Sequence, residues 1–177
     1  MPFAYFAHLS RRDQVTYERS DATSTLRVPG VEELWPAVED LRAALVGEDG
    51  EDVARSAFAV CVGICRALGA RPPRLEVHAV RPRGNTHELH GLYVPEPEGG
   101  RPATIRVWMR TARKGRAVAF RTFLRTLLHE LVHHFDYELL ALDNSFHTEG
   151  FFRRESSLFW QLVPGSPPAR SRPSDRA

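Results

Sequence analysis

Cysteine, lysine and long apolar runs are all scarce in this chain of 177 residues. Its two cysteines, Cys61 and Cys65, are too few for a disulfide framework or a thiolate zinc site. We interpret them as buried thiols on one helix, which suits a reducing compartment. No stretch approaches the length of a membrane span, and no basic region precedes the short apolar run at the N-terminus. We therefore expect a cytoplasmic protein without a membrane partner.

The composition is that of an ordinary globular protein, with 42% hydrophobic and 26% charged residues. Its net charge of +2 is too small to argue for a nucleic-acid partner by itself. Lys114 is the only lysine, a bias that we attribute to coding before phosphate or carboxylate recognition. We expect a helical extension over residues 1–50, a main domain over 51–163 and a disordered tail over 164–177.

Changes in hydrophobic period predict an α+β fold. An apolar spacing near 3.6 residues indicates helices before residue 50 and over residues 52–68, where Gly69 is a natural C-terminal cap. Alternation then indicates strands over residues 75–80, 89–94 and 104–109, with a turn at 81–84. The longest helix is expected from about Arg116 to Leu139 or Leu140, and a final helix over residues 148–162. The expected architecture is a small sheet of three or more strands packed on that long helix.

The long helix contains the pattern His129-Glu130-Leu131-Val132-His133. Two histidines four apart on a helix project to the same side and can hold one zinc ion. Glu130, a quarter turn from His129, can reach a zinc-bound water and serve as general base. Leucine and phenylalanine residues form an apolar arc on the other side of this helix, so the histidines can face a cleft.

A catalytic zinc needs a third protein ligand and an open position for water. The spacing after His133 excludes the short metzincin arrangement, because Asp136 and Leu139 stand where glycine and histidine are required. His147, Glu149 and Glu155 remain as candidates. His147 follows a helix break, whereas Glu155 lies on the next helix at the separation typical of a glutamate-liganded zinc protease. Spacing alone leaves the choice open.

The stretch LLHELVHHFD…SFHTEGFFRRESSLF resembles the SprT-like zinc metallopeptidases, which include the Spartan DNA–protein crosslink proteases. These proteins carry H-E-x-x-H, a break of about a dozen residues, then a histidine with an aromatic four positions later, here His147 and Phe151. Residues 105–109 are similar to the edge strand of the family, and residues 91–93 to the turn and strand before it. Thr148 replaces the usual glycine, and the cysteines of a C-terminal zinc ribbon are missing.

The resemblance implies a zincin-like metallopeptidase domain over residues 51–163. It implies that His129, His133 and His147 hold Zn²⁺ and that Glu130 is the catalytic base for hydrolysis of protein or peptide substrates. A substrate would pair as an added strand with residues 104–109. On the helix itself, Asp136 is either a carboxylate that orients a ligand imidazole or a helix-surface charge. His134 points off the ligand face, and His87-Glu88-Leu89-His90 only mimics the motif.

Two other functions use the same residues. Seven basic side chains ahead of the motif could contact the phosphates of a nucleic acid: Arg106, Arg110, Arg113, Lys114, Arg116, Arg121 and Arg125. Alternatively, zinc could stabilise a regulatory protein with little or no proteolytic activity. The presence of Glu130 argues against the hypothesis of a regulatory protein, since zinc binding does not require this residue.

Overall fold

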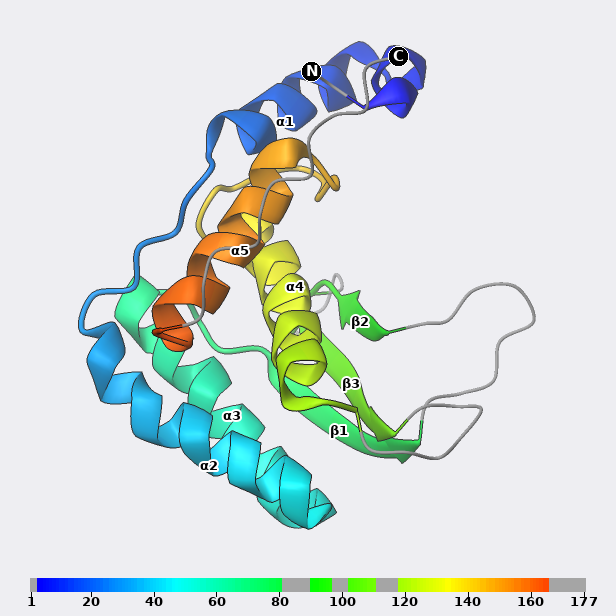
Figure 1. Cartoon of the computed structure of the whole chain (residues 1–177). Helices are drawn as coiled ribbons and strands as arrows, with labels where there is room; N and C mark the ends of the chain where they lie inside the picture. Colours follow the sequence, from blue (N-terminus) through cyan, green and yellow to red (C-terminus); the bar gives the residue numbers. More distant parts are fainter. Residues whose placement is uncertain (1–2, 81–89, 97–101, 111–117, 166–177) are drawn as a thin grey trace, which may run out of the picture.

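The computed structural model of the chain describes residues 3–80, 90–96, 102–110 and 118–165. It is an α+β fold of five α-helices and one small mixed sheet, as the hydrophobic periods predict (Figure 1). Two short 3₁₀ helices, η1 (Ala4–His8) and η2 (Val31–Leu34), precede the first two α-helices. The predicted turn at 81–84 lies outside these ranges, as do most of the motif-like residues 87–90 and most of the tail.

The described sheet has three strands in the order β1-β3-β2: β1 (Arg74–Val80), β3 (Thr104–Arg110) and β2 (Gly91–Val94). β1 pairs parallel to β3, with Val77 opposite Val107, and β2 pairs antiparallel to it, with Tyr93 opposite Ile105. The prediction that residues 104–109 form an edge strand is therefore wrong. β3 is central because Ile105, Val107 and Met109 are buried in the core, which favours pairing on both sides.

Helices α2 (Trp35–Gly47) and α3 (Gly50–Leu68) pack against each other, and α3 also contacts β1 (Figure 1). Pro36 lies in the first turn of α2, where its missing N–H does little harm. Asp49 caps α3 by accepting hydrogen bonds from the backbone N–H groups of Glu51 and Asp52. Gly69 ends α3 in the left-handed conformation, as predicted. Both cysteines are buried on α3.

Helix α4 (Phe120–Glu138) lies between the sheet and α5 (Glu149–Leu162), and begins four residues after the predicted start (Figure 1). The expected apolar arc is buried, including Leu124, Leu128 and Phe135. Much of the opposite side is buried as well, because α5 covers it, and both Val132 and Asp136 are fully enclosed. The reading of Asp136 as a helix-surface charge is therefore wrong.

Helix α1 (Arg11–Ala22) packs on α5 at the end where α5 begins (Figure 1). The approach is so close that a Cβ on Gly150 would meet the backbone oxygen of Ser20 at 2.6 Å. Thr148 caps α5, its side chain accepting from the backbone N–H of Phe151. Within the described residues, no helix combines the length and apolar character needed to cross a membrane. The boundary placed at residue 50 stays a prediction.

Candidate metal centre

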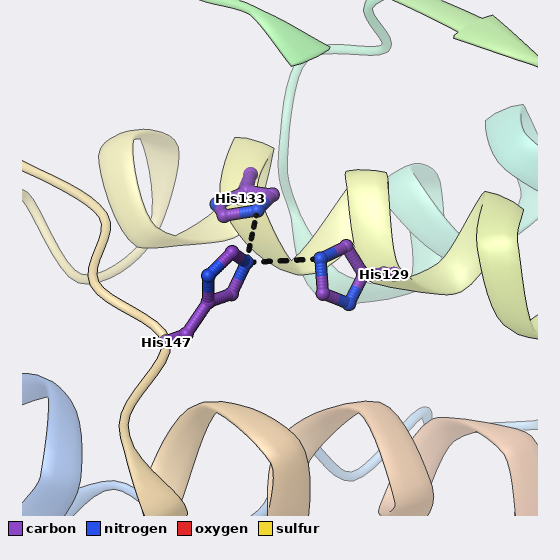
Figure 2. Close-up of side chains that lie close together, drawn as sticks. All are labelled: His129, His133 and His147. Atoms are coloured by element: carbon purple, nitrogen blue, oxygen red, sulfur yellow. Dashed lines mark hydrogen bonds between the residues drawn. The ribbon is translucent and has the colours of Figure 1, made fainter. Parts of the chain in front are cut away.

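Three histidine side chains from two elements meet beside α4 (Figure 2). His129 and His133 stand one turn apart on the helix, and His147 reaches back from the connection between α4 and α5. The Nε2 atom of His147 lies 3.0 Å from Nε2 of His129 and 3.1 Å from Nε2 of His133. The structure thus brings together the three histidines that the family resemblance implies as ligands.

The outer nitrogen of His129 is held by α5. Its Nδ1 lies 3.1 Å from Oε2 of Glu155, whose other oxygen accepts from Arg125 at 3.2 Å. An ionised carboxylate can only accept, so Nδ1 of His129 donates to it and the lone pair of this imidazole lies on Nε2. Glu155 is therefore placed to orient a ligand, which is a different role from that of third ligand.

The outer nitrogen of His133 is held by a longer chain of contacts. Ser145 Oγ donates to Oδ2 of Asp136 at 2.7 Å, and Nδ1 of His133 lies 2.7 Å from the same Oγ. Since the single serine hydrogen goes to Asp136, Nδ1 of His133 must donate and its lone pair also lies on Nε2. Asp136 thus orients an imidazole, as one of the two sequence readings proposed, but acts through Ser145.

Asp136 is completely buried and pairs with Arg154, which is also completely buried. Arg154 Nη2 donates to Oδ1 of Asp136 at 2.7 Å and to Oγ of Ser20 at 2.9 Å. Burial raises the pKa of Asp136 and lowers that of Arg154, while their mutual attraction opposes both shifts. This pair links the metal-side network to α1.

The chemistry of the three Nε2 atoms fits a metal ion. His129 and His133 both present lone pairs, and His147 Nε2 carries at most one hydrogen, so the three nitrogens cannot satisfy one another. Burial is the main cause that lowers the pKa of His133 to about 3 and that lowers the pKa of His147. Both therefore favour the neutral imidazole, which is the form that binds metals. The cluster can hold a metal ion.

Glu130 lies at the same place without belonging to the cluster. Its carboxylate accepts a hydrogen bond from the backbone N–H of Tyr93 on β2, and its side chain is only 6% exposed. Burial raises its pKa to about 7, against the opposing effects of His129 and the Tyr93 N–H. A Cβ on Gly91 would meet the carboxyl carbon of Glu130 at 2.8 Å, so β2 can approach only because residue 91 is glycine.

Two cavities share His129 and Glu130 as walls. One, of about 360 Å³, lies towards the N-terminal end of α4; it is lined by His90, Gly91, Arg125, Thr126, His129, Glu130 and Glu155. The other, of about 320 Å³, lies between β2 and the connection that carries His147. A bound molecule can therefore extend to either side of the histidine cluster.

The connection that carries His147 is held by the N-terminal segment, residues 3–23. The Tyr5 hydroxyl donates to the backbone oxygen of His147 at 3.0 Å, and the backbone N–H of Gly150 donates to Asp21 at 2.8 Å. Arg12 pairs with Asp143, and Ser20 Oγ lies 3.3 Å from Thr148 Oγ1. Sequence reasoning missed this segment because no local pattern marks contacts between residues more than a hundred positions apart. It missed Ser145 and Arg154 because neither residue belongs to a recognisable ligand motif.

The remaining candidates fall outside the cluster. Glu149 is half-exposed and pairs with Arg153 one turn along α5. His134 is buried against β2, donating from Nε2 to the backbone oxygen of Arg71 at 2.7 Å. His90, from the motif-like stretch, lines the larger cavity without joining the three histidines.

Four of the seven basic residues considered for nucleic-acid binding lie in described ranges, and each contacts another side chain. Arg106 pairs with Glu76 and Arg110 with Glu48. Arg121 and Arg125 lie over the ring of Phe159. Contact with phosphates stays a prediction, but these four guanidinium groups already have protein partners.

No protein-family model, no curated protein and no solved structure matches this chain.

Proposed function

We propose that this chain is a zinc-dependent peptidase with a zincin-like fold, of the kind that the SprT-like resemblance implies. One observation carries the proposal. The Nε2 atoms of three imidazoles converge on one point, with lone pairs on those of His129 and His133, and a buried carboxylate that takes no part in the cluster stands next to them. A purely structural zinc site has no use for such a carboxylate, whereas a hydrolase needs it as a base.

Zinc is the metal that suits this donor set best. Neutral imidazole nitrogens are preferred zinc ligands, and three of them leave a fourth position open. Two nitrogens bound at about 2.0–2.1 Å in tetrahedral geometry lie roughly 3.3 Å apart, close to the 3.0 and 3.1 Å separations of the histidine nitrogens. When bound, zinc would polarise the scissile carbonyl and lower the pKa of a bound water towards neutrality.

Glu130 carries the proton transfers. It accepts a proton from the attacking water and then passes it to the nitrogen of the leaving amine. Burial raises the pKa of Glu130 to about 7 in the metal-free protein, and a bound zinc ion would lower it, so that the carboxylate can accept a proton near neutral pH. The Tyr93 N–H fixes one carboxylate oxygen, so that the base keeps its direction through both transfers.

The substrate would lie along β2. Among the described strands β2 is at the edge of the sheet on the side of Glu130, while β3 is paired on both sides. An extended peptide could add to the outer edge of β2 by backbone hydrogen bonds, with its side chains entering the cavities on either side of the histidines. β2 thus takes the role that the sequence suggested for residues 104–109.

The test combines metal analysis with peptide cleavage. We expect about one zinc per chain, lost in His129→Ala and His147→Ala. Glu155→Gln should weaken zinc binding by about 10- to 100-fold, because it replaces the charged acceptor of the His129 Nδ1 hydrogen with a neutral amide. Glu149→Gln, on the same helix, is the matched control and should bind zinc as the wild type does. Zinc retained in His147→Ala and abolished in Glu155→Gln would overturn the assignment of His147.

The catalytic role of Glu130 has its own experiment. Glu130→Gln keeps the size of the side chain and should bind zinc normally, yet lose cleavage of an unfolded protein substrate. If the zinc-loaded wild type cleaves no unfolded or DNA-associated protein, the peptidase proposal fails. Equal cleavage by wild type and Glu130→Gln would leave a peptidase with a different base.

A further inference from the structure

The 320 Å³ cavity beside the histidine cluster is lined by three residues that carry side-chain hydroxyl groups. They are Tyr93 on β2, Tyr137 on α4 and Ser145 in the connection after α4. Peptide hydrolysis develops negative charge on the carbonyl oxygen, and a positioned hydrogen-bond donor next to that oxygen stabilises it. A hydroxyl can act in this way only if its hydrogen is not already donated to another group.

Two of the three hydrogens are already used. Ser145 donates to Asp136, as the orientation of His133 requires. The Tyr93 oxygen lies 3.3 Å from Nδ1 of His134. His134 uses its Nε2–H for the backbone oxygen of Arg71, so Nδ1 is an acceptor and the Tyr93 hydroxyl donates to it.

Tyr137 differs from both. Burial raises the pKa of Tyr137 and the nearby backbone N–H of Ser145 opposes this rise, but that N–H donates to Asn144 Oδ1 at 2.9 Å. In the part of the chain that the structure describes, no group accepts the Tyr137 hydrogen. The O–H of Tyr137 is therefore free to point into the cavity that its side chain lines.

The position of Tyr137 is fixed from both sides. It follows His133 by four residues on α4, which places it on the same face about 6 Å further along the helix axis. Its ring stacks on Tyr93 of β2, with centroids 5.8 Å apart and an interplanar angle of 19°. The ring has little freedom to turn away from the cavity that it shares with Glu130 and the three histidines.

We propose that Tyr137 is a catalytic residue whose hydroxyl donates a hydrogen bond to the carbonyl oxygen of the scissile peptide as negative charge develops there. The inference rests on the proposed peptidase function. As the water oxygen bonds to the carbonyl carbon, the C=O electron pair moves to the oxygen and Glu130 takes the water proton. The C–N bond then breaks, the carbonyl re-forms, and Glu130 delivers the proton to the amine. Tyr137 keeps its own proton throughout. Burial raises its pKa, so the phenol is protonated at neutral pH.

The test uses the full-length zinc-loaded protein and the substitution Tyr137→Phe, which removes only the hydroxyl. We expect unchanged zinc content, a fall in kcat of about 10²-fold and a KM within about threefold, because the donor acts on charge that appears after binding. Affinity for a phosphinic peptide, which mimics the tetrahedral state, should fall in parallel with kcat/KM. Affinity for the matching product peptide should not change.

The control is Ser157→Ala, which removes a part-buried hydroxyl on α5 that donates to the backbone oxygen of Leu26 at 3.4 Å, outside the cavity. It should leave kcat within about twofold. Three results would overturn the role of Tyr137: a kcat for Tyr137→Phe within threefold of the wild type, equal losses in phosphinic and product affinity, or loss of zinc. A wild type that binds zinc but never cleaves would instead refute the peptidase function itself.

Discussion

The two sides of the histidine cluster are built in different ways. On one side, α4 supplies His129 and His133 through the geometry of a single helix whose apolar arc is buried in the core. On the other side, the connection between α4 and α5 supplies His147, which is the most exposed of the three histidines and is held by the N-terminal segment. One side depends on local periodicity, and the other on contacts across more than 120 residues.

The energetic basis of the two sides differs accordingly. Buried leucines such as Leu124 and Leu128 fix α4, and truncating one of them typically costs about 2–5 kcal/mol. The connection relies on single hydrogen bonds worth about 0.5–1.5 kcal/mol each, apart from the buried Arg154–Asp136 pair. The helix side should therefore tolerate the loss of any one polar contact, while the connection depends on a few of them.

The largest expected effect comes from Arg154→Met, which leaves the Asp136 carboxylate buried without its cation. We expect about 3–5 kcal/mol lower free energy of unfolding, measured in urea, because an uncompensated buried charge is costly. The matched control is Arg153→Met, at the exposed residue directly before Arg154, and this change should cost less than about 1 kcal/mol. Similar losses in the two variants would show that the buried pair does not join α1, α4 and α5.

Glu130 gives a pH-dependent test of the helix side. Its folded pKa of about 7 lies above its ordinary value, so the folded state binds the proton more tightly and the wild type loses stability as pH rises from about 5 to 7. Glu130→Gln cannot titrate. In zinc-free protein, its advantage over the wild type should therefore grow with pH, by a difference on the order of 2 kcal/mol.

Urea midpoints of both proteins between pH 5 and pH 8 measure this difference. Histidine shifts that do not depend on Glu130, such as that of His134, are common to the two chains and cancel. A constant gap between wild type and Glu130→Gln across this range would mean that the folded environment does not raise the pKa of the carboxyl.

Gly91→Ala tests how tightly β2 lies against α4. The added Cβ would meet the confined Glu130 carboxyl, and we expect a loss of about 1–3 kcal/mol in stability together with reduced cleavage at normal zinc content. Gly47→Ala is the control, since a Cβ there has no heavy atom within 4 Å. It should change the stability by no more than about 1 kcal/mol. Unchanged activity in Gly91→Ala would imply that β2 can move away from Glu130.

The smallest expected effect belongs to Tyr5→Phe on the connection side. This change removes the hydrogen bond to the backbone oxygen of His147, an exposed contact worth about 0.5–1 kcal/mol. Zinc affinity, measured by competition with a chelator, should fall by no more than about fivefold. A loss above tenfold would mean that the N-terminal segment controls His147 through Tyr5 more strongly than through its other contacts.

Much of the fold could be predicted because local chemistry specifies it. The Asp49 and Gly69 caps bound α3, and alternating residues indicated all three strands within two residues of their observed ends. The position of β3 in the sheet could not be predicted. Alternation of apolar and polar residues indicates which residues form a strand, but not which other strands pair with it. The start of α4 was predicted four residues too early, because Ala119 before the helix has no side chain that could cap it and so gives no N-terminal signal.

The sequence by itself determined that His129 and His133 share one face of a helix with Glu130 beside them, since a 3.6-residue period is a property of the backbone alone. Only the tertiary structure decided the rest. Packing of α1 and α5 brings His147 to the Nε2 atoms of the histidine pair, places Glu155 at the outer nitrogen of His129, and buries Asp136 against Arg154. Close approach of β2 to α4 buries Glu130. These contacts join distant residues, so no local pattern in the chain encodes them.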